Sequence, residues 1–161
     1  MNSPHQLSND EAFARMMSWV EAHYDCEVYF LEHSRQANGF VEYRNGKNII
    51  YILADKEDIS LDTFSDILAH EVGHVIYNQR MMQNGLSYKE IVKRTQEKLD
   101  CFDQLLERNV ITKEEYERLY SAIEEEWDSN HEKERIIPEL RKLTAFHINN
   151  PLIGDNEQNE W

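Results

Sequence analysis

Two histidines and a glutamate stand at the spacing used by metal-dependent hydrolases, because His70, Glu71 and His74 form an H-E-x-x-H sequence. On an α-helix, positions i and i+4 are offset by only about 40°, so both imidazoles would face one metal ion. Glu71 would reach a water molecule beside that ion. Neutral imidazoles suit zinc, and a catalytic zinc site keeps one position open. The pattern predicts Zn²⁺ as cofactor, His70 and His74 as metal ligands, and Glu71 as the catalytic base of a peptidase.

The helix around this motif has the two-sided character that such a site needs. Its apolar residues form an arc on a different side from the His-Glu-His group; they are Phe64, Leu68, Val72, Val75 and Ile76. Gly73 lies inside the motif, where the lack of a side chain would let another element approach closely. We therefore expect one face to pack in a core and the other to carry the metal.

A third protein ligand must come from elsewhere, and a carboxylate from a later helix is the usual choice. Acidic residues are abundant on one predicted downstream helix: Glu124, Glu125, Glu126, Asp128, Glu132 and Glu134. His131 on the same segment is a further candidate ligand, and together with Tyr77 and Tyr120 it is a candidate hydrogen-bond donor to the transition state. Residue types alone do not choose among them.

The elements that must position these residues are readable from local signals. Ser8-Asn9-Asp10-Glu11, Ser87-Tyr88-Lys89-Glu90 and Thr112-Lys113-Glu114-Glu115 each fit a capping box and predict helix starts. The third of these helices is expected to run through Ile123 towards Trp127. Asn84-Gly85 is expected to end the motif helix.

Strand signals lie between the first helix and the motif helix. Residues 26–31 are rich in β-formers, and residues 39–44 and 47–53 flank Asn45-Gly46, a strong hairpin signal. We expect an α+β fold in which a small, largely antiparallel sheet packs on the H-E-x-x-H helix, with further helices downstream.

The length and composition of the chain limit its domain number, its possible partners and its expected location. At 161 residues the chain suits one domain, expected over residues 1–148, with a polar and flexible tail over 149–161. The net charge of −14 argues against direct nucleic-acid binding. Cys26 and Cys101 form no metal-binding spacing. No signal peptide and no apolar run of membrane-spanning length is visible, so we expect a cytoplasmic protein.

The segment from Gly39 to Tyr77 resembles the ImmA/IrrE family of metallopeptidases. In that family a hairpin precedes a helix carrying L-A-H-E-x-G-H, and residues 68–74 here read LAHEVGH. The family's downstream signature is similar to E-A-N-x-F-A-x-x-L-L-x-P, in which the glutamate is the third zinc ligand. Its best counterpart here is Asp128-Ser129-Asn130 followed by Ile136-Ile137-Pro138, although an aspartate replaces the glutamate. The resemblance implies a zincin-like fold with Asp128 as third ligand, and Glu125 and Glu132, about one turn to either side, as alternatives.

The resemblance also implies a function. Members of the family cleave helix-turn-helix repressors of mobile elements or stress regulons, so we expect a zinc endopeptidase whose protein substrate is a DNA-binding repressor. A basic repressor would suit the acidic chain. The alternative is a module on the same fold that sequesters a repressor or antitoxin without cutting it. If a peptide is cleaved, we expect it to pair with a free sheet edge along residues 47–53.

Overall fold

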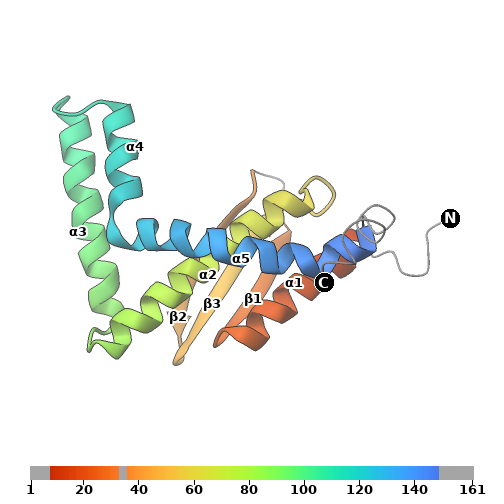
Figure 1. Ribbon diagram of the computed structural model, residues 1–161. Coiled ribbons are helices and arrows are strands. Elements are labelled where there is room, and N and C mark those ends of the chain that lie inside the picture. The colour runs from red at the N-terminus through yellow and green to blue at the C-terminus, as the bar shows by residue number, and fades with distance from the viewer. Residues whose placement is uncertain (1–7, 33–35, 149–161) are drawn as a thin grey trace.

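Three strands and five helices make up the described part of the chain (Figure 1). The structure, a computed structural model, describes residues 8–32 and 36–148, and for residues 124, 125 and 145–148 it describes the backbone. The elements in chain order are α1 (Asn9–His23), β1 (Cys26–Glu32), β2 (Asn38–Arg44), β3 (Lys47–Ala54), α2 (Leu61–Gln83), α3 (Tyr88–Glu107), α4 (Lys113–Ala122) and α5 (Glu124–Ile148). The expected α+β class is confirmed.

The strands form one sheet in the order β1-β3-β2. β2 and β3 pair antiparallel through the predicted hairpin, whose turn residues Asn45 and Gly46 have positive φ angles of 55° and 78°. β1 pairs parallel with β3, so the expectation of a largely antiparallel sheet was wrong for this pair. β3 is the most apolar and most buried strand, and the central position covers it best. That position places β3 rather than β2 beside β1.

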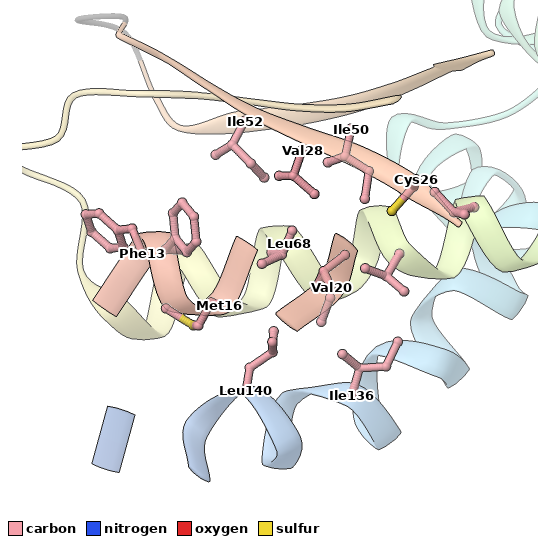
Figure 2. Packing of buried hydrophobic residues seen from close by; sticks show 14 of the residues in the cluster. Phe13, Met16, Val20, Cys26, Val28, Ile50, Ile52, Leu68, Ile136 and Leu140 are labelled. Atoms are coloured by element: carbon pink, nitrogen blue, oxygen red, sulfur yellow. The ribbon is translucent and has the colours of Figure 1, made fainter. Parts of the chain in front are cut away.

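The core lies between the sheet and the helices α1, α2 and α5 (Figure 2). Val28, Ile50 and Ile52 point from the sheet towards α1 and α2, and Ile136 and Leu140 point towards these helices from α5 on the opposite side. α2 is therefore packed between the sheet and α5. This arrangement accounts for a helix that buries residues such as Leu68 and Val72 completely.

Helix starts follow the predicted capping boxes at Ser8, Ser87 and Thr112, and α2 ends at Gln83, with Asn84 as its C-cap and Gly85 at a φ of 98°. The predicted continuation of one helix from Thr112 through Ile123 towards Trp127 was wrong. α4 ends at Ala122, and Ile123 takes an extended conformation with its side chain buried before α5 begins. Burial of Ile123 favours a bend at this residue. Because of the bend, the side of α5 that faces the core is not the side that a continuous helix would present.

α3 and α4 form a helical hairpin that stands away from the rest of the molecule, at the left of Figure 1. It joins the end of α2 to the start of α5. None of the helices in the described ranges has both the length and the apolar character needed to cross a membrane. The tail predicted over 149–161 lies outside the described residues.

Candidate metal centre

His70 and His74 lie one turn apart on α2, with their imidazole rings nearly perpendicular to each other. Their Nε2 atoms are 3.2 Å apart, and the two rings meet at 81°. The predicted spacing thus brings two nitrogen ligands to one point. Both side chains are partly exposed, so a small ion could reach them from solvent.

The third side chain at this point is the carboxylate of Glu126, from the first turn of α5. Its Oε1 lies 3.4 Å from His70 Nε2 and its Oε2 lies 3.0 Å from His74 Nε2. In the described part of the chain, these three residues form the one group of His, Cys, Asp and Glu side chains arranged to hold a metal ion. Zinc–ligand distances of about 2.0–2.1 Å in a tetrahedral site place neighbouring ligand atoms about 3.3 Å apart. The two histidine nitrogens are 3.2 Å apart, and each lies 3.0 or 3.4 Å from a different oxygen of Glu126, so the three side chains are close enough together to contact one metal ion.

Gly73 allows α5 to come close enough to deliver Glu126. A Cβ atom at residue 73 would lie 2.5 Å from Ser129 Cα and 2.7 Å from the Ser129 carbonyl oxygen. Ser129 is fully buried at this crossing and lies one turn after Glu126. The predicted close approach at Gly73 is confirmed, and the approaching element is α5, which carries Glu126.

Replacing Gly73 with alanine should push α5 away from α2 and separate Glu126 from the histidines. The clash is with backbone atoms, which cannot rotate away, so overpacking should cost about 1–3 kcal/mol of the free energy of unfolding. The gain of about 1 kcal/mol in helix propensity works in the opposite direction. Urea unfolding and zinc titration of Gly73→Ala should show lower stability and weaker zinc binding. Gln83→Ala, an exposed change on the same helix, is the control, and equal behaviour of the two variants would contradict this account.

Asn130 orients the His70 ring from behind. It lies one turn after Glu126 on α5, and its Oδ1 accepts a hydrogen bond of 3.1 Å from His70 Nδ1. If His70 is neutral, its proton is on Nδ1, and Nε2 carries a lone pair that points at Glu126 and His74. Lone pairs converging on one another repel unless a cation lies between them. The hydrogen bond thus prepares His70 for a metal ion.

The charge states of the two glutamates differ. Burial works against ionisation of Glu126, but without a metal the protonated forms of His70 and His74 can donate hydrogen bonds to it, and these bonds outweigh burial and lower the pKa of Glu126 to about 2. Burial raises the pKa of Glu71 above its usual value, although the two histidines oppose this. Glu126 is therefore suited to be a permanently charged ligand, and Glu71 to be a group that takes up and releases a proton.

The structure brings Glu126, and not the predicted third ligand Asp128, to the two histidines. Asp128 forms an ion pair with Arg80 of α2 and is absent from the metal-holding group. Two residues correspond to about 200° around a helix, so Asp128 and Glu126 point in nearly opposite directions. Glu132, the second alternative, pairs with Arg135 at 3.0 Å. The side chain of Glu125 lies outside the described residues.

The three residues predicted as hydrogen-bond donors to the transition state have different surroundings. Tyr120 lines the cleft beside the metal residues. Tyr77 is buried under the guanidinium of Arg80, and His131 stacks on Trp127 with ring centroids 3.9 Å apart. Neither Tyr77 nor His131 lines that cleft, so among the three nominees the geometry favours Tyr120.

The cleft over the metal residues has a volume of about 390 Å³. α2 and α5 contribute His70, Glu71, His74 and Glu126, and residues 38–41 of β2 form another part of the lining. Gly39 packs closely on Glu71, since a Cβ at this glycine would lie 2.9 Å from Glu71 Cγ. A sheet strand therefore runs directly beside the expected catalytic base.

The edge strand at this cleft is β2, which has no second partner among the described residues. The expected edge at residues 47–53 was wrong, because β3 is the central strand and pairs on both sides. The sequence suggested β3 because its residues are the better β-formers. That same apolar character places it in the middle of the sheet.

Comparison with protein-family models, with curated proteins and with solved structures gave no match. What can be said of function therefore depends on the site itself and on the resemblance seen in the sequence.

Proposed function

We propose that this chain is a zincin-like zinc peptidase of the kind the ImmA/IrrE resemblance implies, with His70, His74 and Glu126 as metal ligands. The observation that supports it most is the convergence of three ligand atoms within 4.8 Å of one another, beside a buried glutamate. A purely structural cluster would have no need of Glu71, a residue that is 6% exposed and lines the same cleft.

Zinc, when bound, would supply Lewis-acid activation of water and of a peptide carbonyl. Glu71 would take the proton from the attacking water and pass it to the leaving amine. Its raised pKa brings its basicity closer to that needed near neutral pH. Tyr120 would donate a hydrogen bond to the carbonyl oxygen as negative charge develops on it.

An extended peptide could add to the sheet along the outer edge of β2. Backbone groups of an edge strand are available for such pairing, and residues 38–41 line the cleft that holds Glu71. Peptide bonds running along this edge would pass close to the metal ligands. The proposed substrate is a regulatory protein such as a helix-turn-helix repressor, whose basic surface would be attracted to a chain of charge −14.

The alternative function is a binding module that sequesters a repressor or antitoxin without cleaving it. The arm formed by α3 and α4, which extends from the body, would give such a module additional surface (Figure 1). A pure binder would hold its partner with or without metal.

Metal removal separates these two functions. The full chain is treated with a chelator, and one half is reloaded with zinc. Both halves are incubated with a helix-turn-helix repressor and with a mixture of peptides. We expect fragments from the zinc-loaded sample alone, identified by mass spectrometry. An intact repressor that remains bound equally in both samples would support the binding module instead.

A further inference from the structure

The cleft has a wall supplied by the arm, and this wall is built from uncharged side chains. The arm contributes six of the lining residues: Tyr88, Ile91, Val92, Thr95, Gln96 and Tyr120. The first five come from the N-terminal half of α3. The arm is therefore part of the site as well as a connection between α2 and α5.

Charge is sharply segregated around this half of α3. Residues 88–97 include five charged side chains, namely Lys89, Glu90, Lys93, Arg94 and Glu97. None of these five lines the cleft, whereas all five uncharged residues of the same segment do. Helical periodicity explains the pattern, because positions 88, 91, 92, 95 and 96 share one side of a helix.

This side of α3 is left open because α4 is too short to cover it. α3 has 20 residues and α4 has ten. Contacts between the two helices occur in the distal half of α3, where Asp103 accepts a hydrogen bond from Tyr116 and Phe102 packs on the edge of the same tyrosine. In the proximal half, Ile91 is buried but Val92 remains 45% exposed. An exposed valine on the face that lines the cleft is available to contact a ligand.

We propose that the proximal half of α3 selects the substrate by accepting a large apolar side chain next to the cleaved bond, against Val92, Ile91 and Tyr120. This inference rests on the proposed peptidase function and names a class of substrate for it. A charged side chain would lose water without gaining a counterion at this wall, and such burial is costly. Exposed apolar surface on Val92 and Tyr120 would be covered by the same event.

The test is a change of preference in the zinc-loaded full chain. A mixture of synthetic peptides of varied sequence is digested, and the residues flanking each cleaved bond are identified by mass spectrometry. For the wild-type chain we expect Leu, Ile, Met or Phe to be enriched over charged residues at one flanking position. In Val92→Glu the ratio of kcat/KM for Lys to that for Leu at this position should rise by about tenfold or more, since the wall then offers a counterion.

Val110→Glu is the matched control, because it makes the same substitution on the arm at a valine that is 64% exposed and does not line the cleft. Its preference should equal that of the wild type. Val92→Ala is a second test variant. It enlarges the site without adding a charge, so the preference at the flanking position should move towards larger apolar side chains. Zinc content and circular dichroism of all variants should match the wild type.

An unchanged profile in both Val92 variants would overturn the inference, and so would a wild-type profile with charged residues favoured on both sides of the bond. Cleavage of a protein but of no peptide would also overturn it, because the wall would then not select by local sequence, while the proposed function would stand. Absence of zinc-dependent cleavage of both proteins and peptides would instead contradict the proposed function.

Discussion

Glu126→Gln should lower the affinity for zinc by more than about 100-fold while leaving the fold intact. Glutamine has nearly the same shape as glutamate, but it removes the charge that lies 3.0 Å from His74 and 3.4 Å from His70. Loss of outer partners of metal ligands alone typically costs about 10- to 100-fold, so loss of a direct ligand should cost more. Competition titration against a chromogenic zinc chelator measures the effect.

Asp128→Asn is the matched control for this prediction, since it neutralises an acid only two residues away. Asp128 pairs with Arg80 instead of facing the histidines. Its zinc affinity should stay close to that of the wild type. If Asp128→Asn lost zinc and Glu126→Gln retained it, the ligand set described here would be wrong and the assignment from the sequence resemblance would be restored.

Glu71→Gln should abolish turnover without releasing zinc. General bases contribute about 10²- to 10⁴-fold to a rate, and a buried amide cannot accept the proton. Because other residues hold the metal, the zinc content of the variant should be the same as in the wild type. Peptide cleavage is measured alongside elemental analysis of the same samples.

The pH dependence of the wild-type chain provides a further check on Glu71. A base acts in its deprotonated form, so cleavage should fall as the pH drops through the pKa of Glu71. Burial raises that pKa, which places the fall at a higher pH than an exposed glutamate would give. Retention of full turnover in Glu71→Gln would show that another group accepts the proton.

Much of the local structure was predictable because its causes are local. Side chains a few residues apart form the capping boxes at Ser8, Ser87 and Thr112, and Asn45-Gly46 sets its own turn. The pairing of His70 with His74 needs only a regular helix. For the same reason the position of Gly73 could be interpreted as a point of close approach before the partner was known.

The position of Glu126 beside the histidines and the edge of the sheet both depend on tertiary packing, and the sequence did not predict either of them. Glu126 was one of several acids on a supposedly continuous helix, and the break at Ile123 changed which of them faces α2. One signal was available in the sequence: Glu126, Ser129, Ile136 and Leu140 follow a helical stripe, and the last three are fully buried against the core. The stripe places Glu126 on the inner face and Asp128 nearly opposite. The order of the strands likewise follows from how the most apolar strand is covered.

Anomalous diffraction at the zinc absorption edge, from crystals of the zinc-loaded wild-type chain, tests the central claim most directly. A single strong peak about 2 Å from His70 Nε2, His74 Nε2 and a Glu126 carboxylate oxygen is the expected result. A peak coordinated by Asp128 in place of Glu126, or no peak between the two histidines, would contradict the metal centre described here.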